Sequence, residues 1–168
     1  MTREERAALI DRYAAGPAAV AEALAAFPAD QLTAHPLAGK WSAAEIAHHV
    51  ADSETVAAAR IRTLIAEDNP TIKGYSPDAY ATALRYNERD IAPALDTLRA
   101  VRAGTAALLR TFTDAQWHRA GTHSEHGPYS AETWLTIYAE HAHKHAGQIQ
   151  RLREVLRLQG AGSTGERG

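Results

Sequence analysis

A stripe of residues spaced three and four apart predicts a long amphipathic helix that begins at Ser130 and runs to about Leu158, and two positions of its inner face are histidines. That face carries Trp134, Tyr138, His141, His145, Gln148 and Leu152. Residues at this spacing share one side of an α-helix, and in a helical bundle the side that carries the large apolar residues turns inward. Burying two imidazoles without partners costs free energy, so something inside the fold must satisfy them.

A second long helix is expected to begin at Ser42. The segment Trp41-Ser42-Ala43-Ala44-Glu45-Ile46 combines a capping box, Ser42 with Glu45, and a hydrophobic staple, Trp41 with Ile46. The helix should run to about Glu67 and end before Asn69-Pro70. Its inner face carries Ile46, His49, Ser53, Val56 and Arg60, so His49 points inward, and its neighbour His48 lies about 100° away around the helix.

The remaining helices are predicted from the same kind of signal. Thr2 and Glu5 form a capping box for a short first helix; Gly16-Pro17 should interrupt it, and Pro17 should open another helix up to about Ala26. A further helix is expected over about residues 89–111. The connection over residues 68–88 is longer than the 2–8 residues usual in bundles, and a long crossover lets the helices it joins run parallel. The sequence therefore predicts an all-α four-helix bundle.

Composition narrows the possible functions. The chain has 168 residues and 45% hydrophobic content, which fits one domain over residues 1–159, followed by a disordered tail over 160–168. A net charge of −2 provides no basic face for nucleic acid or a membrane surface. The charged start Met1–Arg6 lacks an apolar signal core, so we expect a cytoplasmic protein. Cysteine is absent, so any thiol used in catalysis must arrive on a small molecule.

Three inward histidines on two helices predict a metal site. Three neutral imidazoles and a water form the pattern of an open, catalytic ion, whereas structural zinc sites are closed by four protein ligands. Nitrogen ligation suits Zn²⁺, Ni²⁺, Cu²⁺ or Fe²⁺. A His pair four residues apart also occurs on solvent-facing helices, so the spacing leaves both interpretations open. We expect His35, His48, His118 and His143 to be surface or loop residues.

The segment from Gly39 to Glu54, which includes Trp41-Ser42, Glu45-Ile46 and His49-Val50-Ala51-Asp52, resembles the helix-two signature of the DinB superfamily. A second matching region is His141 together with His145-Ala146-Gly147-Gln148-Ile149. The stretch from Glu67 to Tyr75 is similar to the YfiT-like branch, whose members resemble bacillithiol S-transferases and have been named as candidate metal-dependent hydrolases. The similarity covers about residues 27–152.

This resemblance implies an up-down-down-up four-helix bundle, often a homodimer. It also implies one divalent metal ion, Zn²⁺ or Ni²⁺ foremost, held by one histidine of the second main helix and two of the last. Those positions match His49, His141 and His145, the three residues that the helical stripes select.

Our first hypothesis for function is a metal-dependent transferase that joins a low-molecular-weight thiol, of the bacillithiol or mycothiol type, to an electrophilic small molecule. A metal-coordinated thiol is deprotonated and therefore nucleophilic. The alternatives are a metal-dependent hydrolase that uses metal-bound water, a mycothiol-dependent isomerase, and a stress-related metal-binding bundle without turnover. The first two use the same ligands, so the sequence does not separate them.

Four further residues are candidates for the site. Asp52 is a catalytic candidate that could orient a ligand imidazole or act as a base, with a solvent-facing acid as the alternative. His123, in the loop 122–127 before the last helix, is a second catalytic candidate at the mouth of the site. Arg60 could bind an anionic part of a cofactor, or instead form a fixed ion pair with a protein carboxylate. Tyr75 in the crossover is a second cofactor-binding candidate.

Overall fold

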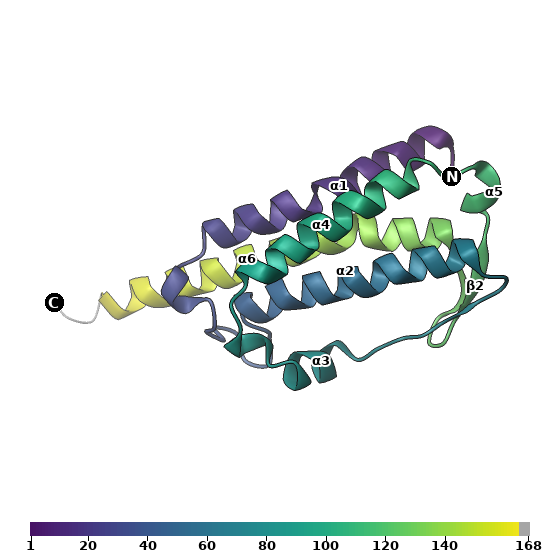
Figure 1. Ribbon diagram of the computed structural model, residues 1–168. Helices are drawn as coiled ribbons and strands as arrows, with labels where there is room; N and C mark the ends of the chain where they lie inside the picture. The colour runs from purple at the N-terminus through teal and green to yellow at the C-terminus, as the bar shows by residue number, and fades with distance from the viewer. Residues whose placement is uncertain (165–168) are drawn as a thin grey trace.

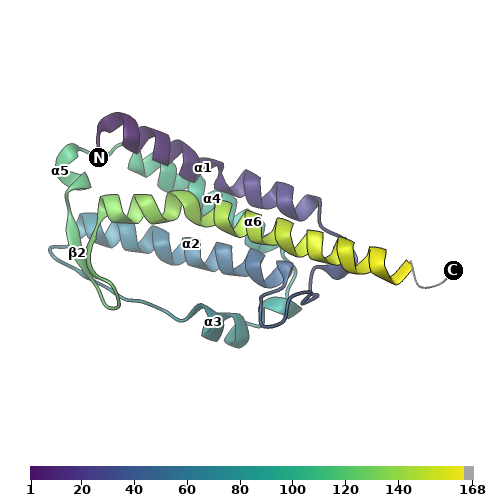
Figure 2. The same ribbon diagram turned by 180° about the vertical axis from the view of Figure 1, so that it is seen from behind.

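The computed structural model describes residues 1–164, and within them four long helices form a bundle (Figure 1). Helices α1 and α6 point one way and α2 and α4 point the other way (Figures 1 and 2). This arrangement is the up-down-down-up bundle that the family resemblance implies, with a long crossover between α2 and α4. The four helices are α1 (Arg3–Ala25), α2 (Ala43–Ala66), α4 (Ala92–Leu109) and α6 (Ala131–Thr164).

Helix starts follow the predicted caps closely. Both side-chain bonds of the capping box are present at Thr2 with Glu5 and at Ser42 with Glu45. At the start of α6, the Ser130 hydroxyl accepts a hydrogen bond from the backbone N–H of Thr133. These bonds satisfy backbone donors that have no partner within the first turn of a helix, and so they fix where each helix begins.

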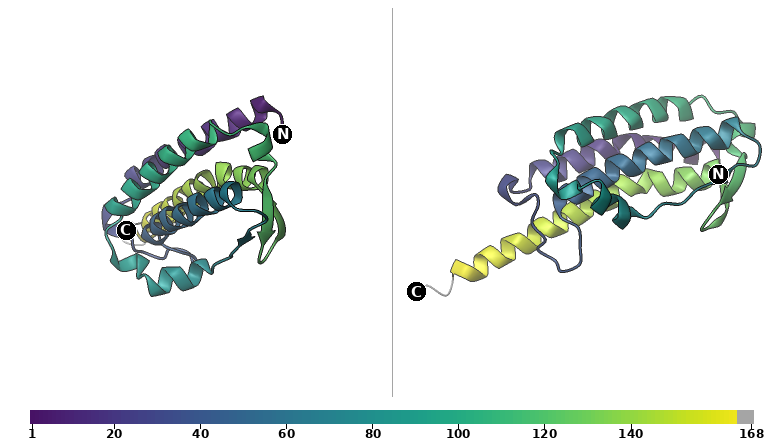
Figure 3. Two further views of the ribbon diagram at one scale, coloured as in Figure 1. Left: turned by 45° about the vertical axis from the view of Figure 1, so that its right-hand side comes forward. Right: turned by 60° about the horizontal axis from the view of Figure 1, so that its bottom comes forward.

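The crossover contains short elements of its own and runs along the outside of the bundle beside α2 (Figure 3). It holds β1 (Thr71–Ile72), α3 (Pro77–Ala83) and the 3-10 helix η2 (Tyr86–Glu88). The 3-10 helix η1 (Ala29–Gln31) lies between α1 and α2, and α5 (Asp114–Trp117) follows α4.

A small three-stranded sheet, which the sequence did not predict, ties the crossover to the start of α6. Strand β1 pairs in parallel with β2 (Ala120–His123), and β2 pairs antiparallel with β3 (Gly127–Ser130). The expectation that residues 122–127 are simply a loop is therefore wrong. Strands of two to four residues that contain Gly121, Gly127 and Pro128 are too short and too poor in β-formers to show alternation in the sequence.

The expected break at Gly16-Pro17 is also wrong, because α1 is one helix with Pro17 inside it. Proline lacks a backbone N–H, so the carbonyl of Tyr13, four residues earlier, loses its helical partner. The structure supplies another donor: Nη1 of Arg102 on α4 lies 2.5 Å from this oxygen. Gly16 makes room for the guanidinium, since a Cβ at Gly16 would lie 2.2 Å from Nη1.

Arg102 is wholly buried and contacts all three other long helices. Its Nε donates to Glu54 on α2 at 2.8 Å, and its Nη2 donates to the carbonyl of Tyr138 on α6 at 2.8 Å. The hydroxyl of Tyr13 on α1 donates to the other carboxylate oxygen of Glu54. On each helix, this polar layer lies between residues of two apolar clusters that form the core.

Helix α6 is longer than predicted. It ends at Thr164 instead of about Leu158, so residues 160–164 of the expected disordered tail are helical, and 165–168 lie outside the described residues. Figure 2 shows the helix extending beyond the rest of the bundle. Within the described residues, no helix is both long and apolar enough to cross a membrane.

Gly16→Ala should destabilise the protein by roughly 1–3 kcal/mol, because the added methyl group would collide with Arg102 and with Ala142. Gly104→Ala is the matched control: a Cβ there meets nothing within 4 Å, so the higher helix propensity of alanine should stabilise by up to about 1 kcal/mol. Urea unfolding of both variants measures the two effects. Equal changes in the two variants would contradict the packing role of Gly16.

Candidate metal centre

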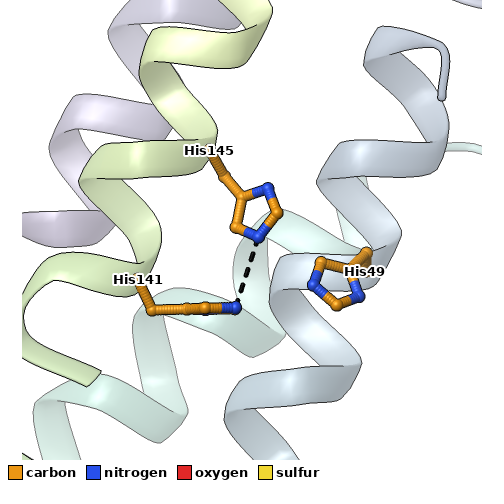
Figure 4. A group of neighbouring side chains, drawn as sticks. All are labelled: His49, His141 and His145. Atoms are coloured by element: carbon orange, nitrogen blue, oxygen red, sulfur yellow. Dashed lines mark hydrogen bonds between the residues drawn. The ribbon is translucent and has the colours of Figure 1, made fainter. Parts of the chain in front are cut away.

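The structure brings the three predicted histidines together between α2 and α6 (Figure 4). His49 lies in the second turn of α2, and His141 and His145 lie one turn apart on the antiparallel α6. One ligand nitrogen from each ring lies within 4.8 Å of the other two. The Nε2 atoms of His141 and His145 are 3.2 Å apart. Two nitrogens bound to one tetrahedral ion at about 2.0–2.1 Å lie about 3.3 Å apart, so this pair already has a suitable spacing.

The ring nitrogens on the far side from this pair show how the rings are oriented. Nδ1 of His145 lies 2.8 Å from the side-chain oxygen of Gln148, one turn further along α6. An amide oxygen only accepts hydrogen bonds, so Nδ1 carries the proton and Nε2 keeps its lone pair for an ion. Nδ1 of His49 and Nδ1 of His141 are buried without a hydrogen-bond partner. These two rings therefore lack the second hydrogen bond by which Gln148 orients His145.

Burial keeps the three rings neutral. Together with a smaller contribution from the neighbouring His145, it lowers the pKa of His141 to about 2 and that of His49 to about 3. Burial also lowers the pKa of His145 below its usual value. Metal ligation requires deprotonated imidazole, so at neutral pH the three rings are in the form that binds an ion.

A cavity of about 650 Å³ reaches this centre at His145 and Gln148. The cavity is also lined by the loop from Leu37 to Trp41, and the centre of the Trp41 ring lies 4.6 Å from that of the His49 ring. Among the side chains that the structure describes, the group at this centre contains three possible ligands. Three protein ligands beside a cavity leave room for a further ligand on the ion, which is the arrangement of catalytic sites.

Asp52 lies near the centre in sequence but does not orient a ligand ring in this structure. Its Oδ2 accepts a hydrogen bond of 2.6 Å from the hydroxyl of Tyr86 in η2. No hydrogen bond joins Asp52 to His49, His141 or His145 among the described contacts. A role for Asp52 as a base therefore stays a prediction.

The expectation that His48 is a surface residue is wrong. Only 2% of its surface is exposed, its Nε2 lies 3.2 Å from the carbonyl oxygen of Arg89, and its ring stacks on Tyr86 at 5.5 Å. The crossover covers this side of α2, and helical periodicity within α2 does not reveal that cover. His35 and His118 are exposed, and His143 is half-buried with its Nε2 2.9 Å from the carbonyl oxygen of Arg12.

Arg60 connects α2 with α6 and the crossover. Its Nη1 donates to the Tyr138 hydroxyl at 3.1 Å, its Nη2 donates to the carbonyl of Lys73 at 2.5 Å, and its guanidinium lies 5.8 Å from the Tyr75 ring centre. Its Nε is buried and unpaired. No ion pair with a carboxylate is formed within the described residues, so the fixed ion pair considered for Arg60 is not seen. The cofactor-binding roles of Arg60 and Tyr75 stay predictions.

His123 lies in β2, buried, and belongs to a separate group of possible ligands with Glu125 and His126. Its Nδ1 accepts a hydrogen bond of 3.2 Å from the backbone N–H of Glu125, and its ring lies 5.4 Å from that of Tyr129. Its proposed catalytic role stays a prediction. The sequence analysis missed this second group, and it assigned no role to Gln148 although Gln148 lies on the inner stripe of α6.

The fold and the site can now be compared with known proteins. The model of the DinB superfamily matches residues 12–149. The chain belongs to the DinB superfamily. A protein of Oceanobacillus iheyensis, named as a candidate metal-dependent hydrolase, is 32% identical over 73% of this chain and 71% of its own length. YfiT of Bacillus subtilis, named in the same way, is 28% identical over 81% of this chain and 77% of its own length.

The solved structure of YfiT from Bacillus subtilis superimposes on this chain with a TM-score of 0.87 and 26% identity, covering 93% of this chain and 90% of YfiT. That structure is described as a metal-dependent hydrolase candidate with an unusual four-helix bundle topology. Together with the three converging imidazoles, these findings support a metal ion in this member of the superfamily.

Wild-type protein loaded with Zn²⁺ or Ni²⁺ and dialysed should retain about one ion per chain, and His49→Ala should retain none, because two imidazoles four residues apart hold an ion too weakly. Gln148→Ala should keep the site but weaken it about 10–100-fold, since it removes the residue that orients His145. Elemental analysis and competition with a chelator measure both effects.

His143→Ala is the matched control, because His143 lies between two of the ligands on α6 yet faces α1. It should bind the ion as tightly as the wild type. Loss of the ion in this variant, or its full retention in His49→Ala, would contradict the site.

The metal-free protein should lose stability as the pH falls below about 6.5, the usual pKa of histidine. The folded-state pKa values of His49 and His141 lie near 3 and 2, so between these values and 6.5 the unfolded chain binds more protons than the folded chain. The free energy of unfolding therefore rises with pH across this window. Urea unfolding in the presence of a chelator, from pH 4 to 7, measures the slope.

His141→Gln should reduce this slope by about one proton, because it removes one of the groups that titrates only in the unfolded chain. His118→Gln, at an exposed position, should leave the slope unchanged. An unchanged slope in His141→Gln would show that the cluster is not buried in its neutral form.

Proposed function

We propose that the protein is a metal-dependent hydrolase of small molecules. The observation that carries this proposal is the convergence of three neutral imidazoles, one of which, His145, lines a cavity of about 650 Å³. The names given to the relatives from Oceanobacillus iheyensis and Bacillus subtilis support the same reaction class. A purely structural ion is usually closed by four protein ligands, and three ligands beside a cavity favour an enzyme over a binding bundle.

The chain's own residues have separate tasks in this proposal. His49, His141 and His145 would hold the ion, and Gln148 fixes the ring of His145 by accepting a hydrogen bond from its Nδ1–H. A divalent ion in such a site lowers the pKa of a bound water and polarises the carbonyl of an ester or amide. The ring of Trp41, packed against His49, keeps bulk water away from one side of the centre.

Hydrolysis also needs a group that takes a proton from the attacking water and returns it to the leaving group. We assign this task to Asp52, which lies one turn after His49 on α2. The Tyr86 hydroxyl holds Oδ2 of Asp52, so the proton would be taken by Oδ1. His123 is the alternative base, and burial holds its pKa below the usual value.

Thiol transfer is the second candidate, and the cations that line the cavity are compatible with it. Lys40 and Arg151 line the cavity and would suit an acidic low-molecular-weight thiol. The chain has no cysteine, so the thiol would be a co-substrate and would be activated at the same ion.

Metal-loaded wild-type protein should hydrolyse members of a panel of small esters and amides without added thiol. Chelation should abolish the activity, and Zn²⁺ or Ni²⁺ should restore it. Asp52→Asn should lower kcat by about 10²–10⁴-fold while the metal content stays unchanged, because it removes a base and keeps the ion. Hydrolysis rates and metal content, measured on the same samples, separate these effects.

Activity that appears only with glutathione, mycothiol or bacillithiol would replace hydrolysis by thiol transfer. No turnover of any substrate by a fully loaded protein, with or without thiol, would leave a metal-binding bundle. His143→Ala is again the control with an intact site.

A further inference from the structure

Two cationic side chains face the cavity at the candidate metal centre and have no acidic partner. Lys40 lies in the loop before α2, and Arg151 lies on α6, six residues after His145. Neither forms an ion pair or a side-chain hydrogen bond within the described part of the chain, although most arginines of this protein do. Unpaired cations that share a cavity wall form a ready site for an anion.

The charge balance of the cavity favours an anion. Its lining holds Lys40 and Arg151 as cations and Asp78 as the one carboxylate, which gives a net charge of +1 with His145 neutral. Oδ1 of Asp78 accepts a hydrogen bond of 3.1 Å from the indole N–H of Trp41, which keeps this acid at the wall. A divalent ion on the three histidines would add to this positive charge, so the cavity favours an anion, and a carboxylate can accept hydrogen bonds from both a lysine and an arginine.

Most of the remaining lining is apolar, and the cavity reaches His145, one of the three candidate ligands. Leu37, Ile46 and Leu152 line the cavity together with the Trp41 ring. Six residues of α-helix separate Arg151 from His145, which is about 9 Å along the helix axis. A small molecule can span that length with an apolar body, an acid at one end and a reactive group at the other.

Arg60, the other candidate for an anion, is less suited to this role. Its guanidinium is bonded to the Tyr138 hydroxyl and the Lys73 carbonyl, and it does not line the cavity. The two cations at the cavity have no such partners within the described contacts.

We propose that the substrates of this protein are carboxylates with an apolar body, bound with the acid on Lys40 and Arg151 and the reactive group at the three histidines. This inference rests on the proposed function and names its substrate class. The acid can belong to the molecule that is cleaved or, in thiol transfer, to the thiol. Both sources have the same chemistry at Lys40 and Arg151.

Binding of two probes tests the site without turnover. The probes are 4-phenylbutyrate and its neutral isostere 4-phenylbutanamide, measured by calorimetry and by intrinsic tryptophan fluorescence, to which Trp41 at the cavity contributes, on metal-loaded protein. We expect the acid to bind roughly tenfold or more tightly than the amide, because two charged hydrogen bonds are lost in the amide. The double variant Lys40→Met with Arg151→Gln should bind both probes equally weakly and keep its metal.

Arg99→Gln is the matched control for loss of charge, because Arg99 is exposed on α4, away from the cavity. It should keep the preference for the acid. Equal binding of acid and amide by wild-type protein, no binding of either, or a preference that survives in the double variant would overturn the proposal. If the double variant keeps the preference for the acid, and chelation of the ion removes that preference in both proteins, the acid binds the metal. This outcome would also overturn the proposal.

Kinetics distinguish the two sources of the acid. If the cleaved substrate carries it, the double variant should raise KM for mono-4-nitrophenyl succinate and not for 4-nitrophenyl butyrate. If the thiol carries it, KM should rise for mercaptosuccinate and not for 2-mercaptoethanol. If no substrate is turned over but the acid still binds more tightly, the proposed function is contradicted and the carboxylate site is supported. If substrates are turned over without any preference for the acid, the proposed function is supported and the carboxylate site is contradicted.

Discussion

The wholly buried guanidinium of Arg102 on α4 joins α1, α2 and α6 by hydrogen bonds, and this directional contact can set the positions of the site residues. It bonds to the Tyr13 carbonyl, the Glu54 carboxylate and the Tyr138 carbonyl. A buried ion pair adds little net stability, because desolvation of the charges offsets most of their attraction. The directional hydrogen bonds of Arg102 can instead fix the axial position of each helix relative to its neighbours.

These axial positions decide whether the three imidazoles meet. Glu54 lies five residues after His49 on α2, and Tyr138 lies three residues before His141 on α6. Arg102 holds both, so the histidines lie opposite each other. Packing in the apolar clusters on either side is less directional than these hydrogen bonds. A slip of one helical turn, about 5.4 Å, would separate the rings by more than an ion can bridge.

The parts of the fold that the sequence predicted are those that local chemistry decides. Capping boxes set the starts of the helices, and the stripes on α2 and α6 select His49 over His48 without any knowledge of the partner helix. The features that the sequence did not predict depend on residues far away along the chain. Pro17 continues a helix because Arg102, far along the chain, takes over the freed carbonyl, and His48 is buried because the crossover covers it.

The same contrast applies to function. Three imidazoles can bind an ion, and a bound ion lowers the pKa of a water or of a thiol. The same three ligands therefore serve either reaction. The choice between hydrolysis and thiol transfer therefore depends on which molecule the cavity binds beside the ion. The cavity is lined mostly by residues that are not metal ligands. Lys40 belongs to a loop, and Arg151 lies on α6 further along than the ligands. Substrate class can thus change within such a bundle while its metal centre and its helix packing stay the same.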